Sequence, residues 1–345
     1  MKFHFSLCPS TPPTRRACGA LAGQMDQPRL IAIVGPTASG KSQLAIKIAS
    51  RINGEIISAD SMQLYRYMDI GTGKASPKDR GRIPHHLIDI IFPDETFSAA
   101  NYKERARGII NALRKTGKNI LIVGGTGLYI KVLLRGLFPS TEADQSFRQE
   151  LREKAHYLGR TFLWQELQEV DPVSASRLHP NDTVRIIRAL EVYRQTGIPL
   201  SHWQKEHSFG DRPYEVLKVG LMRERKDISC RIENRVDHMV REGFEEEVKS
   251  LLNMGYDRHL KSMRGLGYKR MVEYVFGERD FEGAIHLIKQ ETKAYAKRQL
   301  TWFRSDPEVR WVRYPQGEER IMEIVERFVG RERSKPSTVK AAING

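Results

Sequence analysis

One eight-residue segment has the spacing of a phosphate-binding loop: Gly35, Pro36, Thr37, Ala38, Ser39, Gly40, Lys41 and Ser42. An apolar run at residues 30–34 precedes it, and apolar residues at helical spacing follow it, so the loop joins a predicted strand to a predicted helix. In such loops backbone N–H groups and the lysine hold a diphosphate, and the serine hydroxyl can bind Mg²⁺. The segment therefore predicts a diphosphate site with Ser42 as the magnesium-binding residue, but it does not identify the diphosphate.

A carboxylate, Asp60, follows the second predicted strand at residues 55–58. Open α/β sheets place their reactive groups at the carboxyl ends of their strands. Asp60 is therefore a candidate for chemistry beside the loop, and its alternative role is an N-cap of the segment that follows.

The third predicted strand, residues 119–123, runs into Gly124, Gly125, Thr126 and Gly127. A hydrolysing P-loop NTPase usually carries a Mg²⁺-binding acid after such a strand, and no Asp or Glu stands in this segment. The glycines indicate close backbone approach, either to another element or to a ligand at the same sheet edge. The chain thus departs from ordinary P-loop ATPases.

The order of predicted elements indicates an α/β fold: a P-loop NTPase-like parallel sheet core flanked by helices, with an inserted all-helical domain. Residues 139–213 lack strand patterns and contain predicted helices at 148–157, 162–170 and 183–194. A strand at 216–221 then returns to the core, which spans 29–138 and 214–315, and long helices are expected at 226–254 and 281–303. Residues 1–28 are expected to be a disordered extension without function, and residues 330–345 a loose tail.

The composition of the 345 residues narrows the class of protein. Fifty-seven Lys and Arg against 42 Asp and Glu give a net charge of +15, which favours a polyanionic partner such as nucleic acid over a generally basic surface. No apolar run is long enough to cross a membrane. The three cysteines have no C-x-x-C spacing, so a reducing, cytoplasmic setting is expected. His85 and His86 have no further ligand at metal-binding spacing, which favours structural or substrate-contacting roles.

The segment 261–304 is rich in cations and aromatic residues, with ten Lys or Arg against five acids. Helical spacing places Lys293, Lys297 and Arg304 on one side of its predicted helix. Tyr295 and Trp302 also share a side of this helix. Such a face is either simply solvated or contacts a phosphate backbone, and the pattern leaves both interpretations open.

Taken together, the motifs resemble the tRNA dimethylallyltransferase (tRNA isopentenyltransferase) family from about Leu30 to Trp311. The resemblance is carried, in order, by GPTASGKS, ISADSMQLYRYMDIGTGKAS, PHHLIDI, FSAANY, LIVGGTGLY, NDTVRIIRALEVY, RGLGYKRM and KRQLTWFR. It implies an enzyme that transfers a dimethylallyl group from dimethylallyl diphosphate to N6 of adenosine 37, beside the anticodon of tRNA. The C-terminal Cys/His zinc module of some eukaryotic members is absent from the sequence.

The resemblance also implies roles for individual residues. The loop would hold the donor's diphosphate through the N–H groups of residues 37 to 42, Lys41, the Thr37 hydroxyl and Mg²⁺ at Ser42. Asp60 would be the general base that takes a proton from the adenine amine. Arg223 or Arg231 would be a further clamp on the diphosphate, and the sequence does not choose between them.

Family positions for contacts with the tRNA anticodon stem-loop fall on four segments and on two single residues. They are Asp60, Ser61, Met62 and Gln63; Thr126 and Arg148; Val184, Arg185, Ile186, Ile187 and Arg188; Arg264, Gly265, Leu266, Gly267, Tyr268 and Lys269; and Lys297, Arg298, Gln299, Leu300, Thr301, Trp302, Phe303 and Arg304. We expect a monomeric, cytoplasmic enzyme that needs Mg²⁺.

Three alternative functions compete with this interpretation. A small-molecule kinase or ATPase would have the same loop. That function does not explain why the third predicted strand ends without an acid or why the helices are basic. A transferase acting on free adenine nucleotides would have little use for the helical insertion. A nonenzymatic RNA-binding protein would leave the complete loop and Asp60 unexplained.

Overall fold

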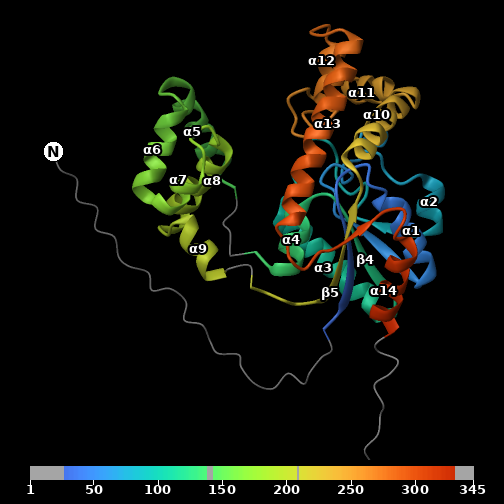
Figure 1. The fold of residues 1–345 in the computed structure, drawn as a ribbon. Coiled ribbons are helices and arrows are strands. Elements are labelled where there is room, and N and C mark those ends of the chain that lie inside the picture. The colour runs from blue at the N-terminus through green and yellow to red at the C-terminus, as the bar shows by residue number, and fades with distance from the viewer. Residues whose placement is uncertain (1–26, 138–142, 208–209, 331–345) are drawn as a thin grey trace, which may run out of the picture.

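The computed structural model describes residues 27–137, 143–207 and 210–330, and its centre is a parallel sheet of six strands in the order β3-β2-β4-β1-β5-β6 (Figure 1). The strands are β1 (Arg29–Val34), β2 (Gly54–Ser58), β3 (His85–His86), β4 (Asn119–Gly124), β5 (Glu215–Met222) and β6 (Arg310–Arg313). Every neighbouring pair is parallel. The predicted fold class is confirmed.

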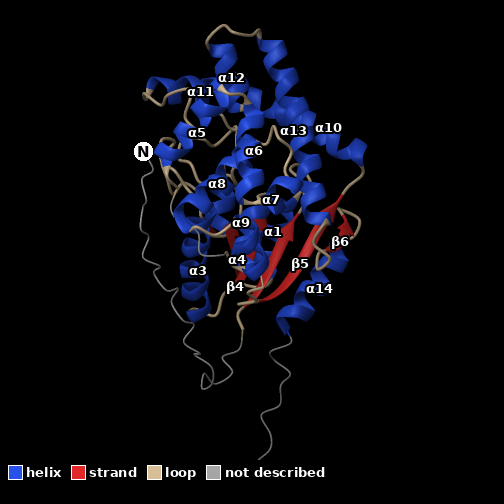
Figure 2. Cartoon of the chain, turned by 90° about the vertical axis from the view of Figure 1, so that its left-hand side faces the viewer, coloured by secondary structure: helices blue, strands red, loops and turns tan. Residues whose placement is uncertain are grey.

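Strand β1 shows why the sheet is buried on both faces. Successive side chains of a strand point to opposite faces, so Leu30, Ala32 and Val34 enter one apolar cluster while Ile31 and Ile33 enter the other. Helices α1 (Lys41–Arg51) and α14 (Glu318–Gly330) cover the second face, and α3 (Ala99–Lys115) and α4 (Gly127–Arg135) cover the first. Figure 2 shows the strands with helices around them.

The pairing register aligns the carboxyl ends of the central strands. Val34 of β1 lies opposite Gly124 of β4, and Ser58 of β2 lies opposite Val123. The loops that follow β1, β2 and β4 therefore leave the sheet at one edge, which is where the predicted reactive residues lie.

A second group of helices lies between β4 and β5 in the chain and packs around its own apolar cluster, which includes Leu151, Leu163, Leu167, Ile186 and Leu190. In Figure 1 this group stands beside the sheet. Its members are α5 (Gln145–Tyr157), α6 (Arg160–Val170), α7 (Pro172–Arg177), α8 (Thr183–Thr196) and α9 (Leu200–His207). The proposed boundary at 139 and most of the expected extension 1–28 and tail 330–345 lie outside the described residues, and the boundary at 213 falls in the described segment just before β5.

The carboxyl-terminal part of the chain differs from expectation in one helix and in elements that were not predicted. The single helix predicted over 226–254 is wrong, because it divides into α10 (Arg225–Arg241) and α11 (Phe244–Asn253). Gly243 takes a left-handed conformation with φ of +92° at the break, which ends one helix and starts the other. The remaining helices are α2 (Pro77–Arg82), α12 (Tyr268–Val275) and α13 (Phe281–Arg304), and β6 and α14 were not predicted.

Gly124→Ala is expected to destabilise the protein by about 1–3 kcal/mol, the usual cost of overpacking. An ideal Cβ at Gly124 would overlap the backbone of Ala59, so the ends of β2 and β4 would have to separate. Gly108→Ala is the matched control, because nothing lies within 4 Å of its Cβ position in α3, and it should be neutral or stabilise by up to about 1 kcal/mol. Urea unfolding midpoints of the two variants compare these effects, and equal midpoints would contradict the tight contact.

Candidate functional site

The phosphate-binding loop follows β1 directly and ends in the first turn of α1. Gly35 and Gly40 have φ of +142° and +98°, and an ideal Cβ on Gly40 would lie 2.7 Å from Tyr314 Cε1. The first N–H groups of a helix have no acceptor within the helix, and the helix dipole favours an anion there. Helix α1 begins at Lys41, so the N–H groups of Lys41 and Ser42 are available to a phosphate.

Two other N–H groups of the loop are already used, which corrects the expectation that all amides from 37 to 42 serve the ligand. The Thr37 N–H donates to Gln299 Oε1 at 2.8 Å, and the Ser39 N–H donates to the Pro36 carbonyl at 3.3 Å. The loop therefore presents fewer free donors than the sequence suggested.

Three cations contact carbonyl groups of this loop. Lys41 Nζ donates to the Pro36 carbonyl at 2.6 Å, Arg223 Nε to that of Ser39 and Arg231 Nε to that of Ala38, both at 2.8 Å. The sequence left Arg223 and Arg231 as alternatives, and the structure brings both of them to the loop.

The pKa of Lys41 is lowered to about 7, mainly by burial; Asp60 raises it and Arg235 lowers it by smaller amounts. Arg235 is a site residue that the sequence analysis missed. Its Nη2 donates to the Thr72 carbonyl at 3.1 Å, and burial lowers its pKa although Asp60 raises it. Arg231 and Arg235 are four residues apart in α10 and so share a face, which is the signal that could have identified Arg235.

Asp60 lies at the carboxyl end of β2, as predicted, and is half-buried. Its Oδ1 accepts the N–H of Met62 at 2.9 Å, so the carboxylate also fixes the turn that follows it. Asp60 can therefore cap the turn that follows it and still lie beside Lys41.

Thr126 joins the loop after β4 to the loop that carries Asp60. Its N–H donates to the Ala59 carbonyl at 3.0 Å, and its Oγ1 accepts the N–H of Ser61 at 3.1 Å. Tyr295 of α13, which the sequence did not place in the site, lies beside Thr126 and Gln299, and burial together with Asp60 raises its pKa.

The glycines of this loop make close contacts within the protein. A Cβ at Gly124 would overlap Ala59, one at Gly125 would overlap Gln299 Nε2, and one at Gly127 would overlap Trp302. Of the two alternatives left open by the sequence, approach to another protein element accounts for all three positions.

Gln63 and Met62 link Asp60 to further loops. Gln63 accepts from Ser58 Oγ at 3.0 Å and donates to the Gly73 carbonyl at 3.3 Å. Met62 packs against Gly265, so the turn at 264–269 lies close to the Asp60 loop.

Several residues expected to contact tRNA are buried, and their side chains cannot reach a surface ligand. Ile186 and Ile187 pack inside the helical group. Tyr268 is fully buried and donates to Glu247 at 2.6 Å. Gln299 and Phe303 are 6% and 4% exposed. The exposed members of the predicted set are Val184, Arg185, Arg264, Lys269, Lys297, Arg298, Thr301, Trp302 and Arg304.

In the helical group, Glu191 holds two of the expected arginines. Its carboxylate is fully buried and accepts two hydrogen bonds from Arg148, at 2.8 and 2.7 Å, and one from Arg188. The side chains of Arg148 and Arg188 are 25% and 27% exposed. Because one carboxylate faces two cations, this pair keeps a net positive charge at the surface.

The two neighbouring histidines have structural partners. His86 contacts Glu55 at 2.7 Å, and His85 contacts the Ile83 carbonyl at the same distance. Across the described ranges, no group of three His, Cys, Asp or Glu residues could hold a metal. None of the described helices combines the length and apolarity that a bilayer crossing requires.

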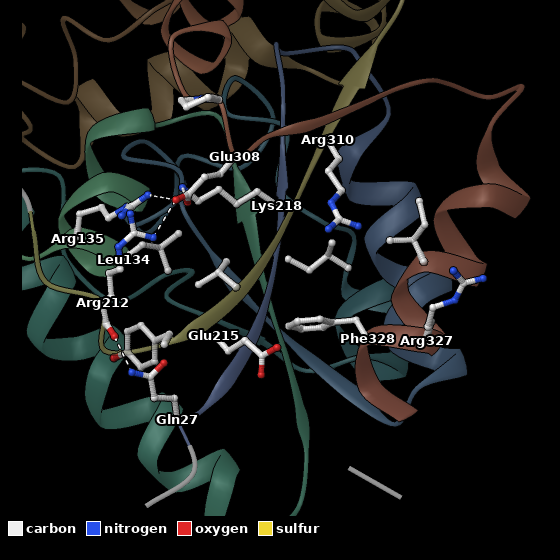
Figure 3. A pocket seen from close by; sticks show the side chains of 15 residues that line it. Gln27, Leu134, Arg135, Arg212, Glu215, Lys218, Glu308, Arg310, Arg327 and Phe328 are labelled. Carbon is white, nitrogen blue, oxygen red and sulfur yellow. Dashed lines mark hydrogen bonds and ion pairs between the residues drawn. The ribbon is translucent and has the colours of Figure 1, made fainter. Parts of the chain in front are cut away.

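A cavity of about 670 Å³ lies at the amino-terminal half of β5, away from the loop (Figure 3). Several of its cations are neutralised by Glu308, which accepts from Lys218 and Arg212 at 2.9 Å each and from Arg135 at 2.5 Å. Although burial raises the pKa of Glu308, these bonds lower it to about 2. The pairs tie together the segments on either side of the helical group.

Binding of inorganic pyrophosphate should weaken as the pH rises, because Lys41 loses its proton near pH 7 and only the ammonium form attracts the anion. Above that pH, the ratio of the wild-type Kd to the Kd of Lys41→Met should rise by up to about tenfold per pH unit. Dividing by the Kd of the variant corrects for titration of the pyrophosphate itself. Calorimetry from about pH 7 to 9 measures this ratio. A constant ratio would show that Lys41 does not titrate in this range.

The sequence matches the family model described as IPP transferase over residues 63–306. A "tRNA dimethylallyltransferase 2" of Geotalea uraniireducens is 52% identical over 291 residues, which cover 84% of this chain and 94% of that protein. The "tRNA dimethylallyltransferase" of Geobacter sulfurreducens is 51% identical over 302 residues, 88% of this chain and 97% of that protein.

Two solved structures are also similar. The tRNA isopentenylpyrophosphate transferase of Bacillus halodurans has a TM-score of 0.65 and 38% identity, covering 88% of this chain and 99% of that one. A eukaryotic dimethylallyltransferase acting on tRNA has a TM-score of 0.76 over 91% of this chain and 81% of that one, and at 24% identity this likeness concerns the fold. By the family model and the identity to its relatives, the chain belongs to the IPP transferase family of tRNA dimethylallyltransferases.

Proposed function

We propose that the protein transfers a dimethylallyl group from dimethylallyl diphosphate to N6 of adenosine 37 in tRNA, giving N6-isopentenyladenosine and diphosphate. The observation that carries this proposal is the edge of the sheet, where a loop surrounded by cations lies beside the half-buried Asp60. The relatives' names support the substrate class, and the geometry is consistent with a separate place for each half of the reaction.

The first half is departure of the diphosphate. Breaking the allylic carbon–oxygen bond leaves both electrons on the leaving group, so the site must stabilise developing negative charge. Lys41, Arg223 and Arg231 lie around the loop, and the N–H groups at the start of α1 point in the same direction. The Thr37 hydroxyl adds a further donor. The arginines contact loop carbonyls in this structure, and in this proposal they would also attract the leaving group.

The residues present fit Mg²⁺ if substrate oxygens and water supply most of its ligands, as is common for this ion. Ser42 is exposed in the first turn of α1 and would be the protein's ligand. When bound, the ion would neutralise charge on the diphosphate.

The second half is attack by the adenine amine. The amine must lose a proton as the carbon–nitrogen bond forms, and Asp60 is the carboxylate at this edge that can accept it. An adenine stacked in the anticodon loop would have to be flipped out to reach the site. Ser61, Met62, Gln63 and Thr126 are held around Asp60 by hydrogen bonds and packing, and would line that base.

The remaining surface would hold the anticodon stem-loop of a tRNA. Exposed cations lie on α13 and in the turn before α12. The Arg148–Arg188 pair lies in the helical group. We propose that residues 139–213 form a tRNA-binding domain inserted into the core, and that the enzyme acts as a cytoplasmic monomer.

Incubation with dimethylallyl diphosphate, Mg²⁺ and bulk tRNA, followed by nucleoside mass spectrometry, tests the proposal. We expect prenylated adenosine in the tRNA digest and none from AMP, ADP or ATP. Product from the free nucleotides alone would indicate an adenylate prenyltransferase, and ATP turnover without prenyl donor would indicate a kinase or ATPase.

Asp60→Asn should retain tRNA affinity and lose transfer by about 10²-fold or more, the scale of a general base. The amide oxygen can still accept the Met62 N–H, so this variant separates the proton-accepting role from the capping role. Single-turnover rates at saturating donor measure the effect. A turnover close to that of the wild type would leave Asp60 with the capping role only.

Lys297→Ala and Arg298→Ala should each weaken tRNA binding and reduce the slope of log Kd against log salt by about 0.7–1. Lys47→Ala is the control, because Lys47 is equally exposed but lies on α1, paired with Glu318. Filter-binding titrations between about 50 and 200 mM salt give the slopes. Affinity that does not respond to salt would rule out a phosphate-contact surface.

A further inference from the structure

We infer that Gln299 is a positioning residue that holds the phosphate-binding loop against the loops carrying Thr126 and Asp60. This inference rests on the proposed function, since it assigns a role within that site. It replaces the expectation that Gln299 contacts tRNA, because the side chain points inward and is 6% exposed.

The orientation of the Gln299 amide is fixed by its two partners. Oε1 accepts the Thr37 N–H at 2.8 Å, and Nε2 donates to the Gly125 carbonyl at 3.0 Å. A backbone N–H can only donate and a carbonyl can only accept, so the reversed amide would lose both bonds. One side chain therefore bridges the loop after β1 and the loop after β4.

The bridge continues to Asp60 through the preceding turn of α13. Tyr295, four residues before Gln299, lies beside the side chains of Gln299 and Thr126. Thr126 in turn accepts the N–H of Ser61, next to Asp60. Two neighbouring side chains of one helix thus connect the diphosphate loop to the loop that carries the carboxylate.

Gly125 leaves room for the Gln299 amide because it has no side chain. A Cβ at that position would overlap Gln299 Nε2, so any other residue would displace the amide. On the opposite side of the same helix turn, Lys297, Arg298 and Thr301 are exposed. The helix therefore presents its outer face to tRNA and its inner face to the diphosphate loop.

A defined consequence follows for substrate binding. The Thr37 N–H is occupied by the bridge, so Gln299 acts on the diphosphate through the shape of the loop and not as a ligand. Loss of the bridge leaves a buried N–H and a buried carbonyl without partners, which favours other loop conformations. Affinity for the diphosphate should fall, while affinity for tRNA should stay the same.

The test uses Gln299→Met, which keeps the length of the side chain and removes both hydrogen bonds. Without tRNA present, the Kd for inorganic pyrophosphate should rise about tenfold, as expected when buried partners are left unpaired. The Kd for tRNA should stay within about twofold of wild type in the same preparations. Lys297→Ala, on the outer face of the same helix, should give the reverse pattern.

Gly125→Ala is the second variant, and it is used if Gln299→Met does not fold. It should raise the pyrophosphate Kd in the same way. A weakened tRNA Kd with unchanged pyrophosphate binding would overturn the inference and restore Gln299 as a tRNA contact. Unchanged affinity for both ligands would also overturn it. Failure of the wild type to prenylate tRNA would instead refute the proposed function, and the pyrophosphate comparison would still decide on the bridge.

Discussion

The parallel register of β2, β4 and β1 is the constraint on which the rest of the site depends. It places Ala59, Gly124 and Gly35 at one edge, and the absence of a side chain at Gly124 lets the loops after β2 and β4 touch. Hydrogen bonds from Thr126 to Ala59 and from Ser61 to Thr126 fix that contact. The carboxylate and the diphosphate loop can therefore belong to different loops and still act on one reaction.

The charges at this edge favour group transfer over hydrolysis. Lys41, Arg223 and Arg231 contact the loop, Arg235 acts on Lys41 through its charge, and burial makes the charged form of Lys41 costly in the absence of an anion. Asp227 pairs with Arg223 at 2.7 Å and Asp60 stabilises the Lys41 charge, so these two carboxylates offset part of the positive charge, and a diphosphate leaving group would offset the rest. The loop after β4 carries no acid to hold a metal for attack by water, and it is filled instead by contacts with α13.

Sequence reasoning identified the loop, Asp60, the sheet and the basic helix because each depends on local spacing or on composition. Helical spacing separates Gln299 from Lys297 on α13, but it does not show what each face of the helix contacts. Gln299 lies between exposed Arg298 and half-buried Leu300 in the sequence, and only tertiary packing reveals that it points to Thr37. The side chains of Ile186 and Ile187 pack inside the helical group, which the motif could not show because it gives residue types without their direction.

The break at Gly243 and the added elements β6 and α14 show a second limit. A glycine within a helical pattern is tolerated in some helices and ends others, and packing of the following Phe244 into the core decides between them here. Arg235 was missed although its four-residue spacing from Arg231 puts both on one face of α10, and Tyr295 was missed because a single tyrosine in a helix has no spacing signature of its own. Each became visible through its partner, Thr72 for Arg235 and Thr126 for Tyr295.

The most direct measurement of the central claim is the fate of the oxygen that bridges carbon and phosphorus in the donor. With dimethylallyl diphosphate labelled with ¹⁸O at that position, and with tRNA as acceptor, the account predicts that all of the label leaves with the diphosphate, because the carbon–oxygen bond breaks. Label recovered in free dimethylallyl alcohol, with the tRNA unmodified, would mean that water attacks phosphorus and the phosphorus–oxygen bond breaks, and would contradict the account.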